Sequence, residues 1–242
     1  MSSELVNFNY QSSPVDWCEN NYYFHNLICE FNNSWSSILY TLSALYIFSK
    51  YYNFIKNPFI YGIIFAGFLV GITSFLFHST LSLAGQLLDE GSIIIFIVSS
   101  DLVINKKYFL TIIISTFLIA SLFFPSYCRF VLFLLGLLVI KNTIENIKKN
   151  HLNLYPYFKQ TLNLLIIAVT FWIIDMVICD YLLFAVHFIW HIISAIALHN
   201  LTILSILMYN RNLTLTNKNI SLLNPIYFLK KKYKRNQIET IM

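Results

Sequence analysis

Seven long apolar stretches constrain this chain more than any other feature, because a helix needs about 20 mostly apolar residues to cross the hydrocarbon core of a bilayer. The stretches are continuously apolar rather than alternating, which favours helices over the strands of a barrel. Only 11% of the residues are charged, against about 25% in soluble domains, so a water-soluble globule is excluded. Collagen-like, disordered and nucleic-acid-binding proteins are excluded with it, because Gly and Pro are few and 17% of the residues are aromatic. The stretches cover 34–54, 58–78, 83–104, 108–125, 128–146, 161–180 and 182–209.

The distribution of Lys and Arg predicts how the helices are oriented, because cytoplasmic loops carry an excess of these residues. With the N-terminus outside, all of the 16 Lys and Arg except Arg129 fall in inner loops or in the C-terminal tail. An odd number of helices agrees with this placement, since the two termini then lie on opposite sides. We therefore predict an all-α, polytopic membrane protein, a bundle of seven transmembrane helices with its N-terminus lumenal or outside and its C-terminus cytoplasmic. Its parts are a lumenal head (1–33), the seven-helix transmembrane domain (34–209) and a basic cytoplasmic tail (210–242).

Ionisable residues within the apolar stretches are costly in a bilayer and are therefore candidates for function. The predicted topology places several of them at a similar depth in the outer leaflet, together with a nearby serine: Ser74, His78, Asp89, Asp175, His187 and His191. His187 and His191 are four residues apart and share a helix face. With a third histidine from another helix, they would form the three-His ligand set of catalytic zinc, which leaves one position open for water. The alternative for an intramembrane histidine is a hydrogen-bonded core residue, and we prefer it for His199.

The head carries a second group of polar residues: Asp16, Glu19, Asn21 and Glu30. Carboxylate and amide oxygens, together with backbone carbonyls, are the ligands that Ca²⁺ prefers. A solvated acidic head is the alternative interpretation. Cys18 and Cys29 both fall on the outer side, where a disulfide can form, and the sequence leaves their pairing open.

These residues occur in motifs through which the chain resembles the alkaline ceramidases, a family of seven-helix membrane hydrolases. The resemblance runs from about residue 14 to 210. The motifs are Asp16-Trp17-Cys18-Glu19-x-Asn21-Tyr22, Glu30-Phe31-x-Asn33, Ser74-x-x-x-His78-x-Thr80-Leu81, Gln86-x-Leu88-Asp89-Glu90, Trp172-x-x-Asp175-x-x-x-Cys179 and His187-x-x-Trp190-His191. The chain departs from the family pattern at Asn32, where the family usually has Trp, and at Gly91-Ser92, where it has Pro-Met. The connection between the last two helices is also unusually short.

The resemblance implies an enzyme that cleaves the amide bond of ceramide, or of a related N-acyl sphingoid lipid, to give a sphingoid base and a fatty acid. It implies catalytic zinc held by His78, His187 and His191, with Ser74 and Asp89 beside the bound water. It further implies Ca²⁺ at Asp16, Trp17 (through its carbonyl), Glu19, Asn21 and Glu30. Finally, it implies a membrane of the endoplasmic reticulum or Golgi as the location.

In the mechanism that we expect, zinc lowers the pKa of the attacking water to about 7. Asp89 acts as general base and then as general acid, and Ser74 donates a hydrogen bond to the developing oxyanion. Two alternatives come from other classes of protein. One is a zinc-containing seven-helix receptor similar to the adiponectin/progestin receptor group, which generally has the opposite orientation. The other is a non-catalytic membrane protein with buried polar networks.

Overall fold

The structure is a computed structural model that describes residues 8–106, 125–181, 185–210, 213–215 and 229–231. Its long helices are α1 (Phe31–Tyr51), α2 (Phe59–Thr80), α3 (Leu83–Ile104), α5 (Cys128–Asn150), α6 (Tyr155–Val177) and α7 (His187–Tyr209). Single 3₁₀ turns occupy Tyr52–Phe54, Pro125–Tyr127, Leu152–Leu154 and Cys179–Tyr181. Two short strands, β1 (Leu213–Leu215) and β2 (Leu229–Lys231), pair antiparallel with Leu213 opposite Lys231.

The helical class predicted from the sequence is confirmed, and six of the predicted stretches correspond to helices. The fourth stretch, 108–125, lies outside the described residues except for Pro125, so the count of seven stays a prediction, as does the orientation. Two helix starts differ from their predicted positions. Helix α6 begins at Tyr155 rather than at 161, because Pro156 has no backbone N–H and is well suited to the first turn of a helix. Helix α7 begins at His187 rather than at 182.

Four of the described helices are long and apolar enough to cross a membrane, as judged by length and composition. They cover Phe59–Thr80, Arg129–Asn150, Leu152–Val177 and His187–Tyr209. Helices α1 and α3 are similar in length but more polar, since α1 contains several serines and asparagines and α3 contains Gln86, Asp89, Glu90 and Asp101. These two helices thus contribute polar side chains to the interior of the bundle.

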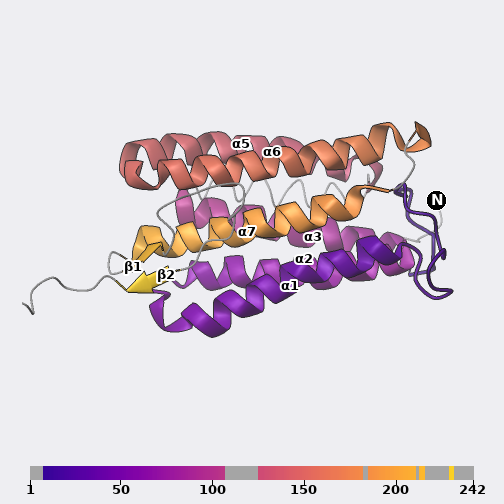
Figure 1. The fold of residues 1–242 in the computed structure, drawn as a ribbon, viewed down its shortest axis with the longest axis horizontal. Coiled ribbons are helices and arrows are strands. Elements are labelled where there is room, and N and C mark those ends of the chain that lie inside the picture. Colours follow the sequence, from indigo (N-terminus) through magenta and orange to yellow (C-terminus); the bar gives the residue numbers. More distant parts are fainter. Residues whose placement is uncertain (1–7, 107–124, 182–184, 211–212, 216–228, 232–242) are drawn as a thin grey trace, which may run out of the picture.

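The helices lie side by side as a bundle, with the head at one end and the two strands at the other (Figure 1). Helix α1 packs against α2 and α7, α2 packs against α3, α3 packs against α5, and α6 packs against α7. The largest core cluster joins α1, α2 and α7 through fully buried side chains such as Ile47, Ile63 and Ile203. This packing brings the end of α2 and the start of α7 close to the head.

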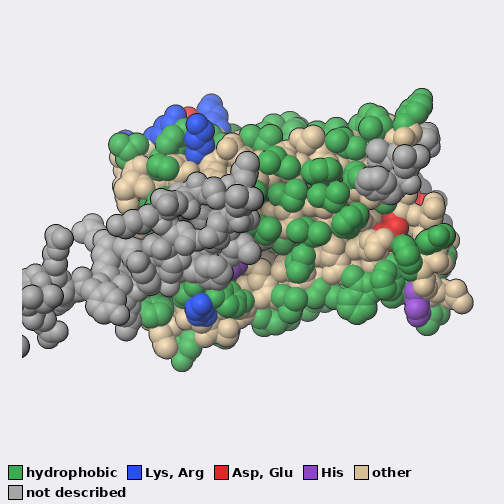
Figure 2. All heavy atoms as spheres, in the orientation of Figure 1, with side chains coloured by type: hydrophobic (Ala, Val, Ile, Leu, Met, Phe, Trp, Pro, Cys, Tyr) green, Lys and Arg blue, Asp and Glu red, His purple; other side chains and the backbone are tan. Residues whose placement is uncertain are grey.

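Hydrophobic side chains are spread over the part of the bundle wall that grey atoms leave visible in Figure 2. Large apolar residues are more than a third exposed on several helices, among them Leu42, Phe65, Leu134 and Ile166. The Lys and Arg side chains visible in this view lie toward the end away from the head, whereas acidic side chains are visible at both ends. A broad apolar wall between polar ends is what a bilayer requires of a membrane protein.

Helix α1 approaches α2 closely at Gly71. A Cβ atom added there would lie 2.6 Å from the backbone nitrogen of Thr41 and 3.0 Å from the carbonyl oxygen of Ser37. Small residues at helix contacts of this kind let backbones approach closely in membrane proteins. The hydroxyl oxygen of Thr41 would obstruct the added atom as well. We expect Gly71→Ala to lower the free energy of unfolding by about 1–3 kcal/mol, because two of the obstructing atoms belong to the backbone and cannot rotate away.

Thermal unfolding in detergent would measure this effect, with Gly136→Ala on α5 as the control. A Cβ atom at Gly136 would meet nothing within 4 Å. Alanine is also a better helix former than glycine, so this variant should be neutral or slightly more stable. Equal unfolding temperatures for the two variants would contradict the proposed close contact.

Candidate metal centre

The hairpin between α2 and α3 places two groups of candidate residues at the head end of the bundle. Helix α2 ends at Thr80, and Leu81 adopts a left-handed conformation with φ of 48°. Ser82 then caps α3, because its hydroxyl oxygen accepts a hydrogen bond from the backbone N–H of Gly85 at 3.1 Å. This tight turn keeps Ser74 and His78 of α2 at the same end of the bundle as Asp89 of α3.

The head is fixed to the end of α2 by its backbone. The last carbonyl groups of a helix have no partners within the helix. Here they accept hydrogen bonds of 2.9–3.0 Å from backbone N–H groups of the head: Glu30 to His78, Cys29 to Ser79, Gln11 to Thr80 and Ser13 to Leu81. The head is therefore docked onto the turn of helix that carries His78.

His78, His187 and His191 come together as the sequence predicts. Each is at most 2% exposed, and their ligand atoms all lie within 4.8 Å of one another. The ring centroids are 5.1 Å apart for His78 and His187, 4.9 Å for His78 and His191, and 4.7 Å for His187 and His191. Three imidazoles from two helices in one buried cluster match the ligand number of a catalytic zinc site.

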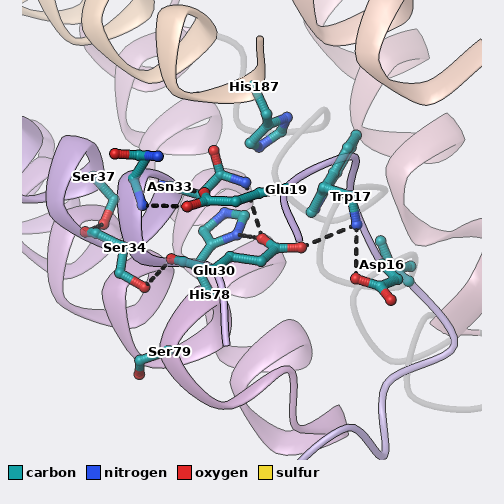
Figure 3. A network of polar contacts seen from close by, with 12 residues as sticks. Asp16, Trp17, Glu19, Glu30, Asn33, Ser34, Ser37, His78, Ser79 and His187 are labelled. Atoms are coloured by element: carbon teal, nitrogen blue, oxygen red, sulfur yellow. Dashed lines mark hydrogen bonds and ion pairs between the residues drawn. The ribbon is translucent and has the colours of Figure 1, made fainter. Parts of the chain in front are cut away.

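The partners of two of these rings indicate which nitrogen is available to a metal. The Nδ1 atom of His191 lies 2.8 Å from the hydroxyl oxygen of Ser36 and 3.1 Å from the carbonyl oxygen of Asn33. The Ser36 hydroxyl itself donates to the Asn33 carbonyl, so both oxygens are placed to accept a hydrogen bond from Nδ1. The Nδ1 atom of His78 lies 2.5 Å from Oε2 of Glu30, and the arrangement is drawn in Figure 3. Donation from Nδ1 leaves the Nε2 lone pair of each ring free, which is how ligating histidines are usually oriented.

His187 is held differently. Its Nδ1 atom is buried and has no hydrogen-bond partner among the described residues. Its ring stacks on the indole of Trp17, with centroids 3.9 Å apart and planes at 27°. A buried imidazole without a hydrogen-bond partner at Nδ1, next to two rings that have lone pairs available, fits a metal ion well.

Ser74 and Asp89, the two residues expected to flank the reacting water, are both buried. The Ser74 side chain lies beside the Asp89 carboxyl group, close enough to interact with it. Within the part of the chain that the structure describes, Oδ1 of Asp89 has no hydrogen-bond partner. Such an oxygen is available to a ligand, and the catalytic roles of both residues remain predictions.

His199, which we interpreted as a core histidine, lies two turns further along α7 than His191. It is buried, and its Nδ1 atom is 2.9 Å from the hydroxyl oxygen of Ser43. It does not belong to the three-His group. This placement agrees with a packing role.

The predicted calcium ligands of the head contact one another through a network that also reaches His78 (Figure 3). The backbone N–H of Trp17 donates to Oε1 of Glu30 at 3.0 Å and to Oδ1 of Asp16 at 3.1 Å. The Asn21 amide donates to Asp16 at 3.2 Å. The Glu19 carboxylate accepts the backbone N–H groups at the start of α1, Asn32 at 2.6 Å and Asn33 at 2.9 Å.

Burial raises the pKa of the Glu19 and Glu30 carboxyl groups. Neighbouring carboxylates raise both values further, Glu30 acting on Glu19 and Asp16 acting on Glu30. Oδ1 of Asn21 is buried without a hydrogen-bond partner among the described residues. Among the described residues the histidines form a group compact enough to hold a metal ion, whereas the head acids do not, so the Ca²⁺ site stays a prediction.

The structure also shows features of the site that sequence reasoning missed. Cys18 is joined to Cys179, 161 residues away, by a disulfide, and Cys29 is a buried free thiol. The pairing that the sequence left open, Cys18 with Cys29, is thus not the one observed. The contact of Glu30 with His78 and the stacking of Trp17 on His187 were also missed. Both residues were singled out only as calcium ligands, and no spacing rule connects a loop residue to a distant ring.

Comparisons with known proteins agree with this arrangement. A family model described as Ceramidase matches residues 9–228. The chain is 31% identical over 220 residues to alkaline ceramidase 1 of Mus musculus, which covers 78% of this chain and 77% of the mouse protein. It is 42% identical over 102 residues to the alkaline ceramidase of Drosophila melanogaster, covering 40% and 36%. It is 26% identical over 251 residues to the alkaline ceramidase of Caenorhabditis elegans, covering 90% of each chain.

Proposed function

Because this chain belongs to the ceramidase family and is thereby a ceramide amidohydrolase, we propose that it is a zinc-dependent enzyme that cleaves the amide bond of ceramide within the membrane. The products are a sphingoid base and a free fatty acid. The family match decides between the enzyme and the two alternatives, a receptor and a non-catalytic protein, in favour of the enzyme. The observation that carries the zinc proposal is the buried group of three histidines whose ligand atoms lie within 4.8 Å of one another.

In this proposal His78, His187 and His191 hold the zinc ion. When bound, zinc supplies a Lewis acid for the amide carbonyl and lowers the pKa of a nearby water. Glu30 and the Asn33 carbonyl fix the rings of His78 and His191 through Nδ1, so that both present Nε2 to the metal. This fixed arrangement lets the ligands bind without large reorganisation.

Asp89 and Ser74 supply the proton transfer and the hydrogen bond that amide cleavage requires. Asp89 takes the proton of the attacking water and delivers it to the amine that leaves, so one carboxylate serves both steps. The Ser74 hydroxyl donates a hydrogen bond to the oxygen on which negative charge develops. The burial of both side chains supports this assignment, since a site closed to bulk water strengthens such interactions.

We place the hydrocarbon tails of the substrate in the apolar interior of the bundle. A narrow cavity of about 10 Å³ lies between α1, α2, α3 and α7, on the side of the histidines away from the head, and apolar residues such as Ile47, Ile63 and Phe96 line it. Room for the tails would therefore require these helices to move apart. Tyr40 lines the same cavity and lies edge-on to the ring of His191, with centroids 6.0 Å apart. This contact connects the apolar interior to the proposed zinc site.

We place a structural Ca²⁺ ion in the head, with Asp16, the Trp17 carbonyl, Glu19, Asn21 and Glu30 as ligands. The support is the crowding of the three carboxylates and the unpartnered amide oxygen of Asn21. Glu30 would then be shared, since it also accepts the hydrogen bond from His78. Calcium bound to the head would help to hold a zinc ligand in place.

The proposed location is the membrane of the endoplasmic reticulum or Golgi, with the head and the active site lumenal and the tail cytoplasmic. The positive residues away from the head support this orientation (Figure 2). Protease digestion of sealed vesicles tests it with an epitope tag at the C-terminus. Cleavage of the tag in intact vesicles is expected, and a protected tag would contradict the orientation.

We expect the detergent-purified protein to release fatty acid and sphingoid base from ceramide in equal amounts, and Asp89→Asn to reduce the rate by about 10²–10⁴-fold. The expected loss arises because asparagine cannot accept and return the proton. Zinc content should be unchanged, since Asp89 is not among the proposed ligands. Product analysis by mass spectrometry and zinc analysis of the same preparation measure both effects.

Asp101→Asn on the same helix is the matched control. Asp101 is also a buried acid of α3, but it lies more than three turns from Asp89 and contacts Asn105. This variant should keep the wild-type rate. Wild-type activity in Asp89→Asn would remove the proposed role of Asp89, and failure of the wild-type protein to cleave ceramide would remove the proposed function.

A further inference from the structure

We propose that Asp175 is a positioning residue for the metal centre, whose single carboxylate holds both the start of α7 and the head segment that covers His187. This inference rests on the proposed function, because it takes His187 to be a metal ligand. Asp175 lies in the last turn of α6 and is 1% exposed. It touches neither substrate nor metal in this proposal and acts through other residues.

The carboxylate accepts three backbone hydrogen bonds from two segments far apart in the sequence. Oδ1 accepts from the N–H of Val186 at 2.8 Å and from the N–H of His187 at 3.1 Å. Oδ2 accepts from the N–H of Cys18 at 3.0 Å. Both oxygens of one buried side chain are therefore committed to fixing backbone.

The first contact caps helix α7. The first N–H groups of a helix lack partners within it, and Val186, at the N-cap position, makes no side-chain capping bond. Asp175 provides the cap from a different helix, and its negative charge also suits the positive end of the α7 dipole. Because His187 is the first residue of α7, one of the captured N–H groups belongs to the proposed metal ligand itself.

The second contact holds the surface that covers the His187 ring. Cys18 directly follows Trp17, and the indole of Trp17 stacks on His187. The rings of His78 and His191 are oriented by partners at Nδ1, but His187 has none among the described residues. The orientation of His187 must therefore come from its backbone and from ring stacking, and Asp175 fixes both.

The direct test is Asp175→Asn, which keeps the shape of the side chain but has only one accepting oxygen. Either the N–H groups of Val186 and His187, or the N–H of Cys18, then face an amide NH₂ that cannot accept a hydrogen bond. We expect the dissociation constant for zinc to rise about 10–100-fold, the range found for residues that orient metal ligands. The zinc dissociation constant is measured by competition with a chelator series in detergent, independently of any activity. The head stays tethered in this variant by the disulfide to Cys179, so the effect reports orientation rather than detachment.

Thr161→Ala on the same helix controls for a loss of stability alone. Thr161 is fully buried, and its hydroxyl donates to the Tyr157 carbonyl at 3.1 Å. We expect this variant to unfold at a lower temperature but to bind zinc as the wild type does.

In Asp175→Asn we expect kcat to fall more than KM changes, because the metal centre rather than the apolar tail site is disturbed. Wild-type zinc affinity in Asp175→Asn would overturn the proposal, and so would an equal loss of affinity in Thr161→Ala.

If Asp175→Asn does not fold, Asp175→Glu is the second test. Glutamate keeps the charge and both acceptor oxygens, but its extra methylene shifts them relative to the start of α7. A folded Glu variant should lose zinc more readily than the wild type, and wild-type zinc retention would overturn the proposal. A wild-type protein that binds no zinc would instead refute the zinc function on which the inference rests, so the two failures are distinguishable.

Discussion

Replacing His78 with alanine is expected to abolish fatty-acid release from ceramide and to remove zinc from the purified protein. His78 supplies one of three buried ligands, and its ring centroid lies about equally far from those of His187 and His191, at 5.1 Å and 4.9 Å. Two histidines at the start of α7 do not complete the set typical of a catalytic zinc site. The rate should fall by roughly 10³-fold or more, because metal catalysis supplies several kcal/mol of transition-state stabilisation.

His199→Ala is the matched control for this loss. It removes a second buried histidine, one that contacts Ser43 in the core. Zinc content should stay at the wild-type value and ceramide cleavage should persist, although the unfolding temperature should fall. His199 also lines the cavity next to the proposed site, so any change in ceramide cleavage is expected in KM rather than as a loss of activity. Stoichiometric zinc or substantial activity in His78→Ala would show that the proposed ligand set is wrong.

Glu30→Gln is expected to weaken zinc binding by about 10–100-fold although Glu30 is not one of the proposed zinc ligands. One Glu30 oxygen accepts from Nδ1 of His78 and from the side-chain amide of Asn33. The other oxygen accepts from the backbone N–H of Trp17. Glutamine has a single accepting oxygen, so one of these groups loses its partner. The variant should also lose any stimulation by calcium, because Glu30 is a proposed calcium ligand.

Glu19→Gln separates these two effects. The Glu19 carboxylate accepts only backbone N–H groups of Asn32 and Asn33 in the hydrogen bonds described above, and it contacts none of the three histidines there. We expect its calcium response to fall and its zinc affinity to change less than that of Glu30→Gln, because Glu19 reaches His191 only through the backbone of Asn33. Zinc competition and calcium titration of ceramide cleavage measure both quantities. Unchanged zinc affinity in Glu30→Gln would contradict the coupling between head and zinc site, and an unchanged calcium response in both variants would remove the calcium site.

The sequence predicted the helices well because a bilayer imposes a simple requirement on them. Continuous apolar stretches located α2 and α3 within a few residues. The start of α7 was misplaced by several residues, since it is set by the capping carboxylate of Asp175 on another helix. Hydropathy carries no information about such a contact.

The candidate metal centre was predictable for a different reason. Helical spacing places His187 and His191 on one face, and the alternating directions of successive membrane helices put the start of the last helix at the same depth as His78. The supporting contacts could not be found in this way. The partners of Glu30 and Trp17 depend on how an irregular loop folds over two helix ends, and loop geometry has no periodicity from which to work.

The disulfide between Cys18 and Cys179 has a consequence for the order of events during synthesis. The two cysteines are 161 residues apart, so at about 5–20 residues per second roughly 10–30 seconds of translation separate them. During that interval the head can already dock onto the end of α2, but His187 and His191 have not yet been made. With the proposed ligand set, zinc would bind only after α7 has been made. A nascent chain that terminates before α7 would carry a docked head with one histidine and no metal centre.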